Sequence, residues 1–375
     1  MSPDGTVRHL YVHLPFCASR CGYCDFVTVV GRRGQHRAYV DGLLAELELE
    51  RGVLTPELES VFLGGGTPTF TEPGELARLL RALPPALEVT VEANPETVTP
   101  ELGSLLQECG VNRVSLGVQS FRPRLLSVLD RQAGPDDVRR AVYAFRDANL
   151  DNISLDLIYG IPGQSAADLD ADLSEALALD PEHLSCYELE AKPGTRFTHA
   201  YGAELARQAE AMESYFERVV ARLTAVGYRW YETANFCRPA GLADGRDLRS
   251  RHNLAYWRGR DYLGLGIGAV STIDARRRRT TPRLGVYLAA LAAGETPPRE
   301  IEDLSPDTRR SERVLLGLRL DEPLGVDGLE SAVDWGAVDR LERLGLVQRR
   351  GEARALALTR QGRFLGGGVT AELLA

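Results

Sequence analysis

The chain has 375 residues, of which 44% are hydrophobic and 26% are charged, and its formal net charge is −9. This size suits one large domain plus a smaller one, and the composition is that of a globular protein. The acidic balance argues against a general nucleic-acid-binding protein, and no apolar run approaches the roughly 20 residues that cross a bilayer. Residues Met1–Gly5 lack a basic and apolar leader, so the cytoplasm is the expected compartment.

Short β-rich runs alternate with amphipathic helical patterns from residue 7 to about residue 235. We expect strands at 7–14, 60–65, 88–94, 113–119, 152–160 and 183–190. We expect helices at 36–52, 73–83, 99–109, 135–149, 165–180 and 203–227. This alternation predicts βαβ units with a parallel sheet and right-handed crossovers. The predicted fold class is therefore α/β, as a partial (β/α)6 barrel or, as the second choice, a doubly wound open sheet.

Three cysteines follow the first expected strand, in the run Cys17-Ala-Ser-Arg-Cys21-Gly-Tyr-Cys24. Thiolates are soft ligands that suit zinc or iron–sulfur clusters. A closed zinc site needs four ligands, and no fourth ligand lies at partner spacing nearby. Three thiolates would leave one iron of a cluster open to an outside ligand, and the alternative is three buried or redox cysteines brought together by chance. The remaining cysteines are expected to be buried small hydrophobic residues: Cys109, Cys186 and Cys237.

Polar residues and glycines also follow the later strands, at the ends where βαβ folds collect binding groups. The second strand runs into Gly64-Gly65-Gly66-Thr67, whose amides we expect to receive a carboxylate or an amino-acid head group. The following strands supply carboxylates, an amide and a cation: Glu92, Gln119, Arg131 and Asp156. Taken alone, each of these residues is accounted for as a turn or cap residue at the end of a strand. Together, at successive strand ends, they indicate a binding site.

These motifs resemble the radical S-adenosylmethionine (SAM) superfamily and, within it, the HemN/HemW family. The resemblance rests, in chain order, on YVHLPFC, CGYCDF, FLGGGTPT, VEANPET, NRVSLGVQSF, DLIYGIPGQ and HNLAYW. It implies that Cys17, Cys21 and Cys24 hold a 4Fe–4S cluster whose open iron binds SAM. It also implies that one or two SAM molecules contact the following residues: Tyr11, Tyr23, Gly65, Gly66, Thr67, Glu92, Gln119, Arg131, Asp156 and Val270.

Two branches of this family differ after the third cysteine. The oxygen-independent coproporphyrinogen III dehydrogenases resemble C-x3-C-x2-C-x-C, and Phe26 stands here in place of the fourth cysteine. This difference, and a first strand close to the first residue, favour the heme chaperone branch. This chain departs from the chaperone branch at Val270. Many members of that branch resemble G-A-H-G at this place and so carry a histidine, whereas this chain has Gly268-Ala-Val-Ser.

The segment HNLAYW is similar to one associated with heme in the chaperone branch. The similarity implies that His252 is an axial ligand to heme iron, beside the flat rings of Tyr256 and Trp257. The alternative is a structural histidine next to a buried aromatic pair.

We predict a barrel with a C-terminal strand extension over 1–275, a basic and proline-rich linker over 276–300, and a small α+β domain over 301–375. The run of four arginines at 276–279 is expected to be a solvated face, with a patch for heme propionates or an acidic partner as the alternative. A helix is expected at 305–320, and another from Asp334 to about Leu344. A hairpin and a closing helix should follow. This order resembles a winged helix, but we expect it to cover the barrel mouth or dock a partner rather than bind DNA.

The expected function is that of a heme chaperone that binds a 4Fe–4S cluster, SAM and heme, and passes heme to an acceptor protein. The sequence also fits a second class of function, that of an enzyme. The chain could be a radical SAM enzyme, either an anaerobic coproporphyrinogen III dehydrogenase or a methyltransferase, and it would then need an electron donor. A third possibility is a scaffold whose cluster is structural.

Overall fold

The computed structural model describes residues 6–190, 196–240, 245–351 and 354–375; Met1–Gly5, on which the expectation of a missing leader rests, lie outside this range. Its main sheet has nine strands in the order β11-β1-β4-β5-β6-β7-β8-β10-β9. Six of these strands pair in parallel with the next one along the sheet. They are His9–Leu14 (β1), Leu58–Gly65 (β4), Ala86–Ala93 (β5), Arg113–Gln119 (β6), Ile153–Tyr159 (β7) and His183–Glu188 (β8).

The strand order distinguishes the two predicted architectures. A doubly wound sheet reverses its order at a switch point, whereas here each parallel strand lies beside the one that follows it. The predicted partial barrel is confirmed. The remaining strands of the sheet are Leu263–Leu265 (β11), parallel to β1, and the antiparallel Asn235–Cys237 (β10) and Arg229–Trp230 (β9). The sequence predicted a strand extension at the end of the barrel, which β11 supplies, but it did not indicate β9 and β10, because two or three residues carry no alternation pattern.

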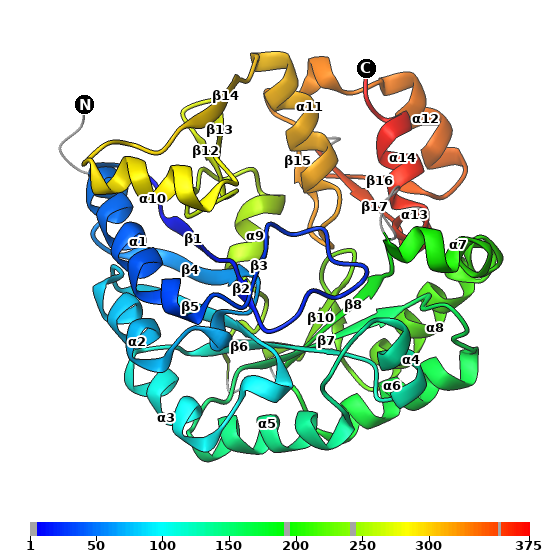
Figure 1. Ribbon diagram of the computed structural model, residues 1–375. Helices are drawn as coiled ribbons and strands as arrows, with labels where there is room; N and C mark the ends of the chain where they lie inside the picture. The colour runs from blue at the N-terminus through cyan, green and yellow to red at the C-terminus, as the bar shows by residue number, and fades with distance from the viewer. Residues whose placement is uncertain (1–5, 191–195, 241–244, 352–353) are drawn as a thin grey trace.

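Helices surround this curved sheet (Figure 1). They are His36–Glu50 (α1), Pro73–Ala82 (α2), Pro100–Glu108 (α3), Pro123–Val128 (α4), Pro135–Asp147 (α5), Ala166–Ala178 (α6), Arg196–Ala209 (α7) and Met212–Ala225 (α8). The helix expected at 203–227 is thus two helices, α7 and α8. Two of the helices, α4 and α7, belong to a separate small hydrophobic cluster with Tyr23 of the cysteine loop. Side-chain caps fix several starts: Thr99 and Ser165 accept hydrogen bonds from the third backbone N–H of α3 and α6.

Strand alternation decides which residues reach the interior of the barrel. In β1, Leu10, Val12 and Leu14 are fully buried in the main hydrophobic core. Because successive side chains of a strand point to opposite faces, Tyr11 and His13 face the other side. The inner face of the sheet therefore carries polar side chains, and the outer face supplies the hydrophobic core.

Residues 276–300 are not the linker that the sequence suggested. The arginine run lies in Arg276–Thr280 (β13), the central strand of an antiparallel sheet with Val270–Ile273 (β12) and Arg299–Asp303 (β14). Leu284–Ala292 (α10) contacts α1. Carboxylates from outside the run neutralise part of it: Arg276 pairs with Asp303 at 2.8 Å, and Arg277 pairs with Glu312 at 2.8 Å. The boundaries proposed at 275 and 301 stay predictions.

The last part of the chain forms a small α+β unit with its own hydrophobic core. Its helices are Pro306–Gly317 (α11), Trp335–Arg343 (α12), Arg360–Phe364 (α13) and Gly366–Glu372 (α14). Its strands are Leu324–Gly325 (β15), Val347–Arg350 (β16) and Ala355–Leu358 (β17), and they form a sheet in the order β15-β17-β16. Asp334 caps α12 by accepting a 3.0 Å hydrogen bond from the N–H of Ala337. The predicted order of helices and hairpin is confirmed.

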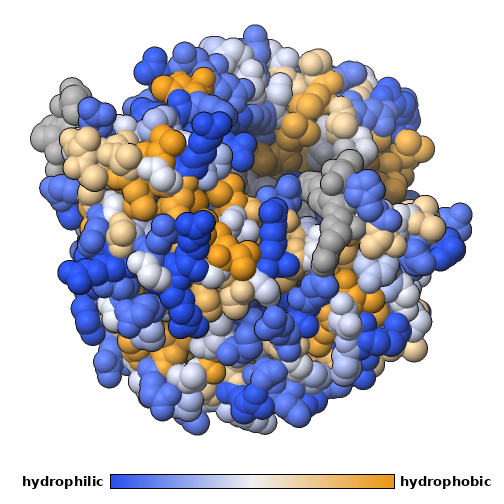
Figure 2. All heavy atoms as spheres, viewed as in Figure 1, coloured by the Kyte–Doolittle hydropathy of each residue, from blue (hydrophilic) through white to orange (hydrophobic). Residues whose placement is uncertain are grey.

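The face seen in Figure 2 is hollowed between α11 and the strands β12 to β14. Among the described helices, none combines the length and the apolar character that crossing a membrane requires.

A buried ion-pair network joins β14 to α1. Arg299 pairs with Glu46 at 2.9 Å and with Glu50 at 2.5 Å, and its side chain is only 9% exposed. Glu46 also accepts hydrogen bonds from the N–H of Gly266 and the hydroxyl of Tyr287, both at 2.8 Å. Burial raises the pKa of Glu46, and these donors oppose that rise. The network therefore ties the segment after residue 276 to the barrel.

We predict that Arg299→Met lowers the free energy of unfolding by about 3–5 kcal/mol, because it leaves two buried carboxylates without their cation. Urea unfolding measures this loss. The matched control is Arg276→Met, which removes an exposed ion pair from the same small sheet and should cost less than about 1 kcal/mol. Equal losses in the two variants would show that the network does not anchor this segment.

Candidate functional site

A cavity of about 680 Å³ opens at the carboxyl ends of the parallel strands. The loop after β1, the ends of β4 to β8 and the helix Arg251–Trp257 (α9) line it. Parallel strands end at one edge of their sheet, so residues far apart in sequence meet there. Of the predicted residues, the structure brings these together: Tyr11, Cys17, Cys21, Tyr23, Cys24, Gly65, Gly66, Thr67, Glu92, Gln119, Arg131, Asp156 and His252.

Val270 is an exception among the predicted SAM residues, because it does not line this cavity. It begins β12 and pairs with Arg279 of β13. Its carbonyl oxygen packs so closely on Gly264 that a Cβ atom there would lie 2.2 Å away. Position 270 therefore packs the small sheet against β11, and its contact with SAM stays a prediction that this cavity does not support.

The three motif cysteines lie around the mouth of the cavity. Cys17 is held in Phe16–Cys17 (β2), which pairs with Val29–Val30 (β3) and so closes the base of the cysteine loop. Cys17 Sγ accepts a hydrogen bond from Thr67 Oγ1 at 3.5 Å, and Cys21 Sγ accepts one from Arg131 Nη1 at 3.7 Å. The loop is thus anchored to the strand ends through two of its sulfur atoms.

The donor set fits a cluster better than a single ion. Among the described residues, no three His, Cys, Asp or Glu side chains converge where one metal ion would bind. A cubane cluster does not need such convergence, because each thiolate binds a different iron. Three soft thiolates around one mouth therefore suit a 4Fe–4S cluster with one open iron. Of the other cysteines, Cys186 and Cys237 are buried as predicted, and Cys109 is partly exposed.

The glycine-rich turn after β4 has a different role from the one expected for its amides. The N–H of Gly65 donates to the Glu92 carboxylate at 3.2 Å. The N–H of Gly66 donates to the Leu14 carbonyl at 2.8 Å, and the N–H of Thr67 donates to the Phe16 carbonyl at 2.9 Å. They are therefore not free to receive a ligand carboxylate. A Cβ atom on Gly66 would lie 2.6 Å from the backbone of Pro15, so close packing of two strand ends requires glycine here.

Two carboxylates face the cavity from neighbouring strands. Asp156 accepts hydrogen bonds from Ser115 Oγ at 2.9 Å and from Ser154 Oγ at 3.0 Å. Burial, and then the charge of Asp156, raise the pKa of Glu92 to about 7, although the N–H of Gly65 opposes this. Near neutral pH Glu92 is therefore partly protonated, and a bound cation would favour its ionised form.

Arg113 is a site residue that the sequence did not reveal. It begins β6, is 2% exposed, and lines the cavity. Its charge lowers the pKa values of Glu88, Glu92 and Asp156, in opposition to burial. Its Nε atom has no hydrogen-bond partner among the described residues. The sequence did contain one indication of this role. Arg113 lies two residues before Ser115 in the expected strand, so the two side chains point to the same face, and that face of β6 lines the interior.

A second missed residue, Asn94, connects the strand ends. Arg131 Nη2 donates to Asn94 Oδ1 at 2.9 Å and to the Gly117 carbonyl at 2.7 Å. Asn94 Nδ2 in turn donates to Thr67 Oγ1 at 3.0 Å. Nearby, the pairing of β6 with β7 shifts between Gly117 and Gln119, and Gln119 has a φ of +66°. This irregular strand end places the Gln119 backbone at the cavity edge.

His252 lies on the floor of the cavity and is 1% exposed. Its Nδ1 atom is 3.0 Å from Ser60 Oγ, and its Nε2 atom is 2.8 Å from the Tyr256 hydroxyl. Burial, assisted by the nearby His9 and Arg113, lowers the pKa of His252 to about 3, so the ring is neutral. Both nitrogens already have partners, so neither is free to bind heme iron in this conformation. The geometry favours the structural alternative for this residue.

Comparison with known proteins agrees with this site. The radical SAM superfamily model matches residues 11–176. The heme chaperone HemW of Mycobacterium tuberculosis is 36% identical over 97% of this chain and 94% of its own length. The heme chaperone HemW of Bacillus subtilis is 32% identical over 96% of this chain and 97% of its own.

A solved structure supports the fold. Coproporphyrinogen III oxidase HemN of Escherichia coli superposes with a TM-score of 0.81, covering 99% of this chain and 90% of that one at 22% identity. The two HemW relatives named above exceed 30% identity over nearly the whole chain, and they decide membership. The chain belongs to the HemW family within the radical SAM superfamily.

Proposed function

We propose that the protein is a cytoplasmic heme chaperone that holds a 4Fe–4S cluster on Cys17, Cys21 and Cys24, binds SAM beside it, and passes heme to an acceptor protein. Position 26 supports this choice most directly. Phe26 lines the cavity mouth and is 66% exposed, where the resemblance gives the dehydrogenase branch a fourth cysteine. The similarity to relatives named heme chaperones adds weight to the proposal.

The charges in the cavity suit SAM, which carries a sulfonium cation and an amino-acid group. The ionised forms of Glu92 and Asp156 would stabilise the cation. Arg131 would offer a guanidinium to the SAM carboxylate near Cys21. Cys17, Cys21 and Cys24 would hold the cluster, which, when bound and reduced, would supply the one-electron chemistry. The residues of this chain bind and orient SAM, and the walls of the cavity limit its contact with water.

The cavity mouth offers a surface for a flat macrocycle. The ring of Phe26 is largely in contact with water, and Tyr187 of β8 is 43% exposed at the same cavity. Aromatic rings that are exposed before binding gain free energy by stacking on a porphyrin. We therefore propose that heme docks at the mouth, near the cluster, rather than on the floor where His252 lies.

The test of this function separates binding from catalysis. The reconstituted protein should bind hemin saturably, with a Soret band that reports the complex. Under anaerobic conditions with SAM, a strong reductant and coproporphyrinogen III, it should form no decarboxylated porphyrin, as measured by chromatography of the products. Multiple turnovers of coproporphyrinogen III would establish a dehydrogenase and overturn the chaperone proposal.

The cluster assignment makes a separate prediction. Replacing any one of Cys17, Cys21 or Cys24 with Ala should abolish the visible absorption of the cluster and most of the bound iron after anaerobic reconstitution, because a cubane needs all three protein ligands. The matched control is Cys109→Ala, at a partly exposed cysteine that does not line the cavity; it should reconstitute normally. Full iron content in a variant of the motif contradicts the assignment.

His252 can be tested independently of the cluster. We predict that His252→Ala lowers the free energy of unfolding by about 1–3 kcal/mol, because Ser60 and Tyr256 lose a buried partner. Its hemin affinity should stay unchanged. Tyr256→Phe keeps the imidazole and releases Nε2, and it too should bind hemin as before. A large loss of hemin affinity in folded His252→Ala, with a gain in Tyr256→Phe, would instead identify His252 as the iron ligand.

A further inference from the structure

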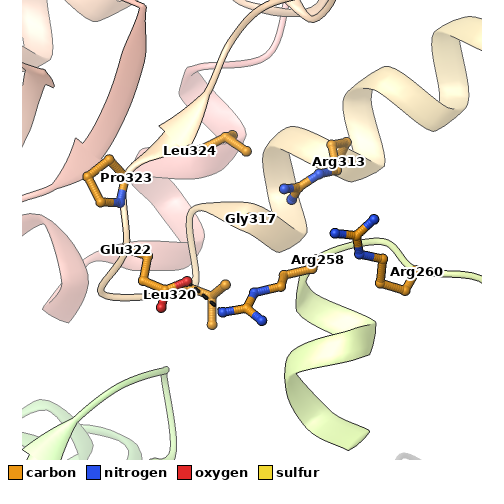
Figure 3. Close-up of a pocket in the computed structure, with 8 residues that line it drawn as sticks. All are labelled: Arg258, Arg260, Arg313, Gly317, Leu320, Glu322, Pro323 and Leu324. Atoms are coloured by element: carbon orange, nitrogen blue, oxygen red, sulfur yellow. Dashed lines mark hydrogen bonds and ion pairs between the residues drawn. The ribbon is translucent and has the colours of Figure 1, made fainter. Parts of the chain in front are cut away.

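A second pocket, of about 310 Å³, lies where the end of α9 meets α11 (Figure 3). Three of its lining residues are arginines: Arg258, Arg260 and Arg313. Arg258 and Arg260 flank Gly259, whose φ of +59° turns the chain directly after the helix. A Cβ atom on Gly317 of α11 would lie 2.6 Å from Arg313 Nη1, so glycine makes room for that guanidinium. The backbone thus brings three cations to one place.

The pocket holds more positive charge than its carboxylates neutralise. Among the described residues that line it, Glu322 is the one acidic residue. Glu322 is shared, since Arg258 approaches it at 2.8 Å and Arg249 at 2.5 Å. Arg313 donates to the Trp257 carbonyl at 3.3 Å.

Arg260 and Arg313 are the cations left without a neutralising partner. Within the part of the chain that the structure describes, neither of them makes an ion pair with a carboxylate. Burial, and then the charges of Arg260 and Arg258, lower the pKa of Arg313. Positive charges at close range destabilise one another unless an anion lies between them.

The adjoining groove, of about 550 Å³, shares Arg258 and Arg260 with the pocket but has a different charge balance. Its arginines face three lining carboxylates: Glu59, Asp247 and Asp261. Arg8, for example, pairs with Glu59 at 3.2 Å. The unneutralised charge is therefore concentrated on the side of Arg260 and Arg313.

We propose that this pocket is a binding site for a doubly charged anion, a phosphate group or a pair of carboxylates. Guanidinium groups present parallel N–H donors that match the oxygen spacing of both groups. Three arginines against one shared glutamate leave two positive charges for such a ligand to balance. Because Arg258 and Arg260 follow α9 while Arg313 belongs to α11, the bound anion also joins the barrel to the C-terminal unit. This site is separate from the cluster cavity and does not depend on the proposed heme function.

Isothermal titration calorimetry of the full-length protein tests the site, with inorganic phosphate and succinate as separate probes at constant ionic strength. We expect saturable binding of one anion per chain for at least one probe. Arg260→Met and Arg313→Met should each weaken it by about tenfold or more, because each removes a charge-assisted contact. Arg350→Met, at an exposed arginine of β16, should bind as the unaltered protein does. Binding of phosphate alone identifies a phosphate-bearing ligand, and binding of succinate alone identifies a dicarboxylate.

Thermal unfolding gives a second readout that does not require a heat signal. Arg260 is exposed, so its replacement does not disturb the core. Without multivalent anions, Arg260→Met should keep or raise the melting temperature, because it relieves repulsion. It should also lose the rise in melting temperature that the bound anion gives the unaltered protein. If neither anion binds saturably, or if Arg260→Met and Arg313→Met bind it as tightly as the unaltered protein, the proposal is wrong.

Discussion

One hydrogen-bonded chain connects the parts of the site that come from different strands. Arg131 binds Asn94, Asn94 binds Thr67, and Thr67 binds the sulfur of Cys17. These residues follow β6, β5, β4 and β1 in turn, so the hydrogen-bonded chain crosses four neighbouring strands at the edge where they end. The contact of Arg131 with Cys21 Sγ brings the cysteine loop into the same network. The placement of the three thiols therefore depends on the register of four neighbouring strands, and not on the loop alone.

The interior of the barrel is charged where a protein core is ordinarily apolar. Glu88, Glu92 and Asp156 share the buried space with one strongly buried cation, Arg113. Burial disfavours the ionised form of each carboxylate, so the cavity has a capacity for further positive charge. A ligand with a sulfonium group, as in the proposed SAM complex, would supply that charge. Because the site is buried, less water would screen its interaction with the carboxylates. The buried carboxylates whose ionised forms burial disfavours are therefore the groups that we propose to bind SAM.

Much of this organisation follows from local sequence, and the rest depends on contacts that local sequence does not show. The 113–119 strand was predicted with its observed bounds, because its apolar residues belong to a regular alternation of strands and helices. Glu92, near the end of one expected strand, and Asp156, within another, were singled out in the sequence, and the family resemblance implied their contact with SAM. By contrast, the run of arginines after residue 275 resembles a solvated loop until β14 places carboxylates opposite it. His252 likewise has a heme-like context in sequence, but Ser60, 192 positions away, occupies one of its nitrogens.

We propose that the three cysteines hold a cluster whose open iron faces SAM in the cavity. Electron paramagnetic resonance of the reconstituted, reduced protein, recorded with and without SAM, tests it most directly. We predict a spectrum typical of one reduced 4Fe–4S cluster, and a clear change in that spectrum when SAM is added, because the ligand binds an iron atom. A cluster spectrum that stays the same at millimolar SAM would contradict the claim. It would indicate that the open iron is blocked or that SAM binds elsewhere.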